Sequence, residues 1–367
     1  MKTSLALLLA SVLMAPVQDP KKPNIIFILA DDLGYGELGC YGQKKIQTPR
    51  IDKMAAEGLR FTNAYSGNAV CAPSRCSLMT GLHQGHAWVR DNRTVGPEGQ
   101  TPLPASTVTV ARLLQSAGYT TGAMGKWGLG GPGTEGDPNK QGFDTFYGFN
   151  CQGHAHNHYP IYLWKNDQRV AQPGNDGTYK GRTFSHDQFE KEALAFIEAN
   201  QARPFFLFLP FTIPHVAIQV PEDSLEPYKD WEEKPYWGDK GYLPHPRPRA
   251  GHAGMISRMD RSVGRVFDLL AKLGLDEKTI VIFSSDNGSI DRVGGHDLPF
   301  FDGNGPLRGE KGQLYEGGIR VPFIARWPGR IKPGTTSDAP IAFWDMLPTL
   351  CEVAGIAKPE KTDGAGL

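Results

Sequence analysis

The sequence predicts an α/β fold in which helices cover both faces of a mainly parallel central sheet. Two observations support this prediction: short apolar runs alternate along the chain with segments of helical periodicity, and these runs are almost continuously apolar. Continuous apolar runs indicate strands that are buried on both faces, as in parallel sheets. In folds of this class, binding and catalytic residues gather at the carboxyl ends of the strands.

Four apolar runs are predicted as central strands, namely 24–30, 205–211, 279–284 and 322–327. Segments whose apolar residues recur with helical spacing lie between and after them, namely 50–57, 107–117, 188–199, 255–272 and 344–354. Two other segments show little periodicity and are predicted as long surface excursions, namely 130–182 and 221–249. Their aromatic residues favour a role in lining a substrate site.

Composition indicates one large, loop-rich domain that spans residues 22–367. The chain is 40% hydrophobic, enough for a large core, while 44 glycines and 29 prolines indicate many turns. Lys and Arg together number 39, as do Asp and Glu, and no long run has one sign. Neither nucleic acid nor a membrane surface is therefore an expected partner.

The first residues have the pattern of a secretory signal. A basic residue is followed by the apolar stretch 5–15, which is too short to span a bilayer, and then by polar residues. We therefore expect residues 1–18 to be removed on export, and the mature protein to be periplasmic or extracellular.

Five cysteines are an odd number for an exported chain, in which paired cysteines are usual. We expect one or two disulfides plus a buried thiol, with structural roles for Cys40, Cys151 and Cys351.

Oxygen donors follow two of the predicted strands. Asp31 and Asp32 come directly after the first strand, and Asp286 and Asn287 follow the strand at 279–284. Either pair alone is most simply a turn or a helix cap. Two pairs at one edge of a sheet instead favour a cation between them, and donors that are all oxygen favour calcium or magnesium over zinc.

Cys71 begins a short predicted helix. Pro73 suits the first helical turn, and Gly81 ends the helical pattern. A helix N-terminus stabilises negative charge, and Arg75 adds a positive charge one turn later. From these residues alone, Cys71 is either a structural buried thiol, which is the commoner case, or a nucleophile whose base the local sequence does not show.

Segment 71–81 resembles the signature of the type I sulfatases, in which the first cysteine is converted to formylglycine; it reads Cys-Ala-Pro-Ser-Arg-Cys-Ser-Leu-Met-Thr-Gly. Other blocks resemble the family in the same order, namely 31–36, 118–121, 125–127, 285–288, 308–311 and 315–318. The resemblance covers almost all of the chain from residue 23 onward. It implies an alkaline-phosphatase-like fold and a sulfatase catalytic domain at 22–367 that is cut short, without the small C-terminal subdomain usual in the family.

The resemblance also implies a site for one calcium ion, held by Asp31, Asp32, Asp286, Asn287 and the modified Cys71. It places basic residues around the sulfate group of the substrate, namely Arg75, Lys126, His215 and Lys311. In the implied mechanism one hydroxyl of the hydrated aldehyde attacks sulfur, with Asp286 as a candidate base, while Lys311 and His215 assist the departing alcohol. The second hydroxyl then expels sulfate, which an ordinary serine or cysteine ester could not do.

One position departs from the family. The block that usually reads Gly-Lys-Trp-His has Gly128 after Trp127, so the imidazole expected to contact the aldehyde hydrate is absent. Three histidines follow in the run 151–159, and we hypothesise that His154 or His156 replaces the missing group. A solvated or substrate-binding histidine-rich loop is an equal alternative.

The activity that the resemblance implies is hydrolysis of sulfate esters, and it implies a formylglycine-generating enzyme as a partner. The expected substrate is a sulfated carbohydrate, because polar and aromatic loops suit sugars. The sequence leaves two alternatives open: a phosphonate or phosphate ester hydrolase on the same fold, and an inactive carbohydrate-binding relative, which the departure at Gly128 suggests.

Overall fold

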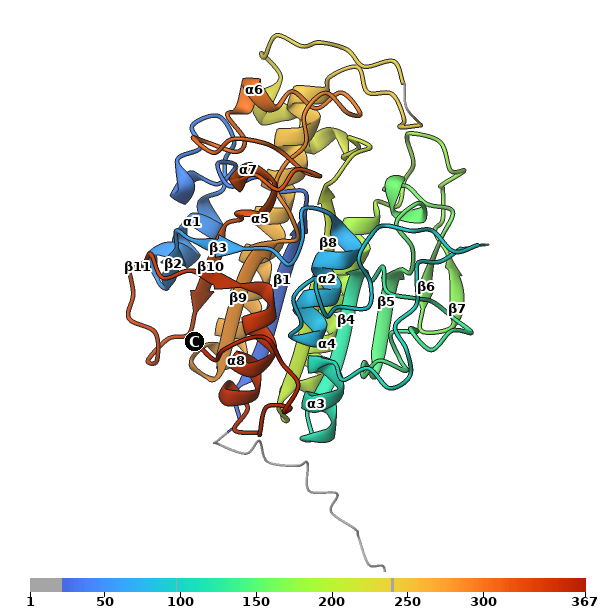
Figure 1. The fold of residues 1–367 in the computed structure, drawn as a ribbon. Coiled ribbons are helices and arrows are strands. Elements are labelled where there is room, and N and C mark those ends of the chain that lie inside the picture. The colour runs from blue at the N-terminus through green and yellow to red at the C-terminus, as the bar shows by residue number, and fades with distance from the viewer. Residues whose placement is uncertain (1–21, 97, 239–240) are drawn as a thin grey trace, which may run out of the picture.

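The computed structural model describes residues 22–96, 98–238 and 241–367, so the predicted signal at 1–18 lies outside the described residues. A ten-stranded sheet forms the centre of the molecule (Figure 1). In spatial order its strands are β11 (Thr335–Ser337), β2 (Leu59–Phe61), β10 (Phe323–Arg326), β9 (Thr279–Ser285), β1 (Asn24–Asp31), β8 (Phe205–Pro214), β4 (Thr120–Lys126), β5 (Thr145–Phe149), β6 (Tyr162–Lys165) and β7 (Gln168–Ala171). A separate small sheet pairs β3 (Ala64–Tyr65) with β12 (Ile341–Ala342).

Five adjacent strands are parallel, in agreement with the prediction of a mainly parallel sheet, although β4 and β5 were not among the predicted strands. β1 pairs in parallel with β8 and β9, and β4 pairs in parallel with β8 and β5. All eight residues of β1 are buried, which explains its continuous apolar sequence. The strand predicted at 322–327 is present as β10, but it runs antiparallel to both of its neighbours.

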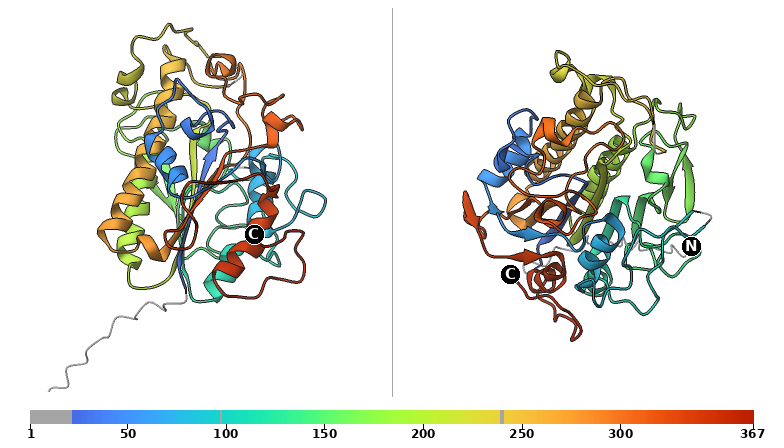
Figure 2. Two further views of the ribbon diagram at one scale, coloured as in Figure 1. Left: turned by 90° about the vertical axis from the view of Figure 1, so that its left-hand side faces the viewer. Right: turned by 45° about the horizontal axis from the view of Figure 1, so that its top comes forward.

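Helices cover both faces of the sheet, as the edge-on view in Figure 2 shows. Successive residues of β1 point to opposite faces, so Ile26 and Ile28 join one core while Ile25 and Phe27 join the other. The first core also holds residues of α1 (Pro49–Ala56), α4 (Ser185–Asn200) and α5 (Pro248–Lys272). The second holds residues of α2 (Cys71–Thr80), α3 (Val110–Ser116) and α8 (Met346–Val353).

Short helices lie in the connections. Two are α-helical, α6 (Leu298–Phe301) and α7 (Glu316–Ile319). The others are single turns of 3-10 helix, at Gly39–Tyr41, His154–His156, Glu222–Ser224, Glu226–Tyr228, Asp276–Lys278 and Phe343–Asp345. No helix within the described ranges is long and apolar enough to cross a membrane.

Two sequence-based expectations were wrong. Segment 130–182 is not a single surface excursion, because it contains β5 and the antiparallel hairpin of β6 and β7, which extend the sheet. These strands are short, and Gly148 interrupts the apolar pattern of β5. The expected disulfides are also absent: all five cysteines, which lie within the described ranges, are free. Cys76 and Cys351 instead pack into the second core as small apolar groups.

Candidate active site

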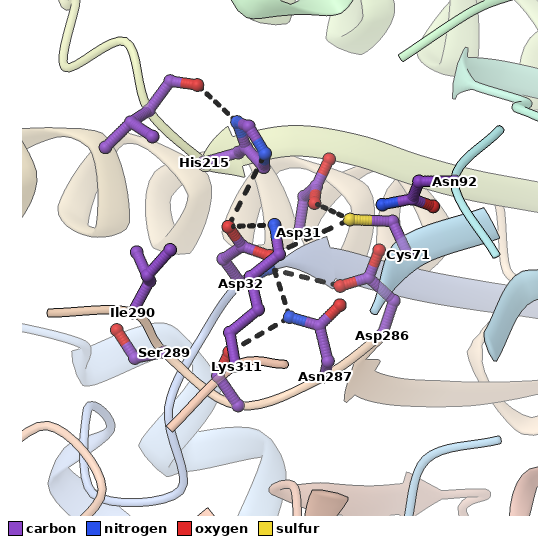
Figure 3. A network of polar contacts seen from close by, with 12 residues as sticks. Asp31, Asp32, Cys71, Asn92, His215, Asp286, Asn287, Ser289, Ile290 and Lys311 are labelled. Carbon is purple, nitrogen blue, oxygen red and sulfur yellow. Dashed lines mark hydrogen bonds and ion pairs between the residues drawn. The ribbon is translucent and has the colours of Figure 1, made fainter. Parts of the chain in front are cut away.

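Polar side chains from separate parts of the chain meet at the carboxyl ends of the central strands (Figure 3). Asp31 is the last residue of β1, Lys126 is the last residue of β4, and His215 follows the last residue of β8. Asp286 and Asn287 follow β9, Lys311 comes from the connection between α6 and α7, and Cys71 and Arg75 come from α2. Neighbouring parallel strands end at the same edge of a sheet, and this topology brings together residues that are far apart in the sequence.

Cys71 is the first residue of α2 and is 1% exposed. The helix ends at Gly81, whose φ of 67° requires a residue that tolerates the left-handed conformation. The Cys71 Sγ atom lies 3.4 Å from Oδ1 of Asp31 and 3.8 Å from Oδ1 of Asp32. Burial, and then the negative charge of Asp31, raise the pKa of the Cys71 thiol. A thiol with a raised pKa is a poorer nucleophile, because the thiolate is the reactive form.

Each carboxylate at the site contacts a buried cation. Lys126 Nζ donates a hydrogen bond of 2.6 Å to Asp31 Oδ2, and a guanidinium nitrogen of Arg75 lies 3.4 Å from the same oxygen. Arg75 also donates to Oδ2 of Asp286 from Nε and from a terminal nitrogen, at 3.0 and 2.8 Å. Lys311 Nζ donates to Oδ2 of Asp32 at 2.7 Å. The buried charges are thus paired, which makes their burial tolerable.

The three carboxyl groups have different pKa values because their neighbours differ. Burial raises the pKa of each, but the charges of Lys126 and Arg75 outweigh burial at Asp31 and leave its pKa well below the ordinary value. The pKa of Asp32 remains raised by burial, although Lys311 opposes the shift. Burial and the charge of Asp31 raise the pKa of Asp286 to about 6. Asp31 is therefore the carboxylate that is most firmly ionised.

His215 directs an unprotonated ring nitrogen toward this cluster. Its Nδ1 contacts the carbonyl oxygen of Val216, which can only accept, so the proton of the neutral ring lies on Nδ1. Its Nε2 faces Oδ2 of Asp32 at 3.5 Å. Burial, and then the charge of Lys311, lower the pKa of His215 well below its ordinary value, so the ring is neutral.

The oxygen atoms of the site suit a cation with oxygen ligands. A carboxylate oxygen of Asp31 and one of Asp32 lie within 4.8 Å of each other and of potential metal-ligand atoms of Cys71 and His215, which offer sulfur and nitrogen. Asn287 donates through Nδ2 to Oδ1 of Asp32 at 2.7 Å, while its own Oδ1 is buried without a hydrogen-bond partner. A buried amide oxygen without a partner, next to two carboxylates, is the environment that a hard cation such as calcium satisfies.

A sequence model of the sulfatase family matches residues 23–356. The chain belongs to the sulfatase family. It is 34% identical to N-acetylgalactosamine-6-sulfatase of Canis lupus familiaris, over 97% of this chain and 66% of that protein. It is 36% identical to arylsulfatase A of Homo sapiens, over 99% of this chain and 70% of that protein.

Solved structures agree with this assignment. The structure of Ps i-CgsB in complex with k-i-k-neocarrahexaose has a TM-score of 0.79 and 30% identity, and the match covers 94% of this chain and 75% of that one. The phosphonate monoester hydrolase of Agrobacterium radiobacter, at 21% identity and a TM-score of 0.67 over 94% of this chain and 76% of that one, shares the fold. The fold is the alkaline-phosphatase-like α/β fold. The chain spans 59% to 70% of the length of three curated relatives that it matches.

In this member of the sulfatase family, one of the two histidines proposed to replace the missing imidazole reaches the cluster and the other does not. The ring of His156 stacks on that of His215, with centroids 4.9 Å apart and an interplanar angle of 17°. His154 lies elsewhere: its Nδ1 is 3.1 Å from Oε1 of Glu98, and its ring packs against Phe149.

The space at Gly128 is filled by a residue that the sequence analysis missed. A Cβ on Gly128 would lie 2.5 Å from Nε2 of Gln152. Gln152 is 6% exposed, and this Nε2 has no hydrogen-bond partner. No sequence motif marks Gln152; the available signal was its position three residues after the last residue of β5, at the edge of the sheet that holds the site.

Proposed function

We propose that this protein is an exported enzyme that hydrolyses sulfate esters of carbohydrates, with a formylglycine derived from Cys71 as nucleophile and one bound calcium ion. The main support is the position of Cys71 in a member of the sulfatase family: it is the buried first residue of α2, and its Sγ atom lies 3.4 Å from a carboxylate oxygen of Asp31 at the end of β1. Relatives named N-acetylgalactosamine-6-sulfatase, and a structural neighbour in complex with a neocarrahexaose, support a sulfated sugar as substrate.

Formylglycine at position 71 would be present as its hydrate, in which one hydroxyl would attack sulfur and the second would expel sulfate. A calcium ion would lie next to it, held by Asp31, Asp32, Asp286 and Asn287. The protein's own cations have separate tasks. Lys126 and Arg75 are fixed by carboxylates at the strand ends, so they stabilise negative charge without having to reorient during the reaction.

Lys311 and His215 are proposed to contact the leaving group. Burial acts to lower the pKa of Lys311, but the charge of Asp32 outweighs it and raises the pKa well above the ordinary value. Lys311 therefore remains charged, and its ammonium group can stabilise the departing oxygen and donate a proton to it; the unprotonated Nε2 of His215 can only accept a hydrogen bond, so its partner would be a hydroxyl group of the substrate.

The test is to produce the protein with and without a formylglycine-generating enzyme and to measure hydrolysis of 4-nitrophenyl sulfate, N-acetylgalactosamine-6-sulfate, 4-nitrophenyl phosphate and a phenylphosphonate monoester. We expect release of sulfate only when the peptide containing Cys71 is lighter by the exchange of sulfur for oxygen and the loss of two hydrogens. The variant Cys71→Ala should show no turnover. Equal activity of unmodified protein, or faster hydrolysis of either phosphorus ester, would contradict the proposal.

A further inference from the structure

Three buried side chains from separate parts of the chain meet outside the candidate active site. Glu37 lies in the connection after β1, His252 lies in α5, and His296 lies in the connection between β9 and α6. Their exposed fractions are 0%, 2% and 4%. Each offers a potential metal-ligand atom, and these three atoms lie within 4.8 Å of one another. The fold thus gathers two imidazole nitrogens and a carboxylate oxygen, which are ligands that transition metals accept.

The three ligand atoms form a closed triangle of nearly the size that a zinc ion requires. His252 Nε2 lies 2.7 Å from Oε1 of Glu37 and 3.1 Å from Nε2 of His296, and His296 Nε2 lies 3.6 Å from the same glutamate oxygen. Nitrogen and oxygen ligands lie about 2.0–2.2 Å from zinc, so tetrahedral angles place them about 3.3–3.6 Å apart. The longest side of the triangle already has that length, and the shortest would have to open from 2.7 Å to about 3.3 Å.

Too few protons are present for these three atoms to satisfy one another. His296 Nδ1 contacts the carbonyl oxygen of Ile290, so the neutral ring carries its proton there and Nε2 has only a lone pair. The Glu37 carboxylate also only accepts. The one proton that His252 can place on Nε2 cannot serve both acceptors, whereas a metal ion between the three atoms would bind all of their lone pairs.

The surroundings of His296 are those of a metal ligand. A backbone carbonyl on the far ring nitrogen, as Ile290 provides, is typical of histidines that bind metals. Burial acts to lower the pKa of His296, but the carboxylate of Glu37 outweighs it and raises that pKa, so this environment stabilises positive charge. The ring of Phe301 packs against both imidazoles and supplies an apolar wall.

The group joins the two chain segments that carry ligands of the candidate calcium site. Glu37 Oε2 accepts from the N–H of Gly34 at 2.7 Å, two residues after Asp32. The carbonyl group that holds His296 comes three residues after Asn287. An ion bound here would therefore fasten both segments to α5.

We propose that Glu37, His252 and His296 form a second metal site, which holds one zinc ion and stabilises the fold next to the candidate active site. Two histidines and a glutamate are a ligand set that proteins use for zinc, with a water molecule as the fourth ligand. Calcium instead takes about six to eight oxygen ligands, so the two sites select different ions. Binding releases the proton of His252 Nε2 to solvent. The zinc ion takes no part in hydrolysis, so the site is independent of the proposed function.

The experiment titrates metal-stripped protein with zinc in excess calcium and measures zinc binding with a competing chromophoric chelator. We expect the wild type to bind one zinc ion per chain with a dissociation constant below about 1 µM, and its melting temperature to rise with zinc concentration. His296→Gln keeps a polar side chain but loses a ligand, so zinc should bind at least about a hundredfold more weakly. Glu37→Gln should also weaken zinc binding.

His86→Gln is the matched control. His83, His86 and Asp363 form another group of possible metal ligands, which is largely exposed, and His86 Nδ1 lies 2.8 Å from Oδ1 of Asp363. Zinc held at the surface would be lost in this variant, whereas zinc at the buried site should bind as in the wild type.

Cobalt(II) in place of zinc identifies the ligands in the wild type, even where His296→Gln fails to fold. We expect the visible spectrum of a tetrahedral site without charge transfer from sulfur, because Cys71 belongs to the other cluster. A wild-type dissociation constant above about 1 µM would overturn the second site. Zinc binding that is lost in His86→Gln but kept in His296→Gln, or a sulfur charge-transfer band, would overturn it as well.

Discussion

Replacing Lys126 with methionine should destabilise the fold, because it leaves the buried Asp31 without its nearest cation. The Lys126 Nζ lies 2.6 Å from Asp31 Oδ2, and the two side chains are 1% and 0% exposed. Unit charges at that distance attract by about 6 kcal/mol at an effective dielectric constant of about 20. Removing one partner of a buried ion pair costs about 3–5 kcal/mol, and we expect the lower end, about 3 kcal/mol, because Arg75 remains 3.4 Å from the same oxygen.

Urea unfolding followed by circular dichroism measures this loss, and hydrolysis of 4-nitrophenyl sulfate should fall at least about hundredfold. Lys165→Met is the matched control: its Nζ lies 3.0 Å from Oε2 of Glu192, but the side chains are 49% and 27% exposed, so its loss should cost less than about 1 kcal/mol. A loss below about 1 kcal/mol for Lys126→Met, or equal losses for the two variants, would refute the desolvated ion pair.

Two further predictions concern the bound cation and acid stability. Calcium should raise the melting temperature in proportion to the logarithm of its concentration. In Asn287→Leu the same rise should require calcium concentrations at least about tenfold higher, because one oxygen ligand is lost. If the variant responds to calcium as the wild type does, the amide of Asn287 is not a ligand. Burial lowers the pKa of His158 to about 4 and that of His186 to about 3. In the unfolded chain the histidine pKa values are near 6.5, so between about pH 6.5 and 4 the unfolded chain binds more protons than the folded protein does. The free energy of unfolding should therefore decrease as the pH is lowered through that window, by about 3 kcal/mol for His158. Urea midpoints at pH 7, 6 and 5 measure this fall, and constant midpoints would contradict it.

Three strands of the central sheet were predictable, because burial on both faces leaves a continuous apolar run in the sequence; β4, although buried, contains two threonines, two glycines and a lysine and was not predicted. β1, β8 and β9 are continuously buried, and each corresponds to a predicted strand within a few residues. The direction of β10 was not predictable, since an apolar run is the same whichever way the strand runs. β6 and β7 are only four residues long and lie at one edge of the sheet; β7 is largely exposed and β6 only partly buried, so neither has the long apolar run that marks a buried strand.

The acidic part of the site was predictable for a topological reason, and the histidines were not. Asp31 ends β1 and Asp286 directly follows β9, and these two strands are adjacent and parallel, so the sheet alone explains why the two residues are close. His154 and His156 lie two residues apart on a single 3-10 turn. With about three residues per turn, side chains at that spacing point about 240° apart around the axis, so one faces His215 while the other faces Glu98. Sequence distance to the site is almost the same for both, and only the phase of the turn separates them.

The charge balance of the site bears on which ester it suits. Asp31, Asp32 and Asp286 contribute three negative charges when ionised, and Arg75, Lys126 and Lys311 contribute three positive charges that lie directly against them. His215 adds none, because its pKa is lowered. One calcium ion would therefore leave an excess of two positive charges.

A sulfate ester carries one negative charge and an ionised nucleophilic hydroxyl carries a second, so the two together would neutralise the excess. A phosphate monoester dianion would overshoot it by one charge in a buried site, where an uncompensated charge is costly. A phosphonate monoester is a monoanion, so it would neutralise the excess charge as a sulfate ester does. Charge alone therefore distinguishes sulfate esters from phosphate monoesters but not from phosphonate monoesters. Discrimination against phosphonates must come from the contacts made by the leaving group.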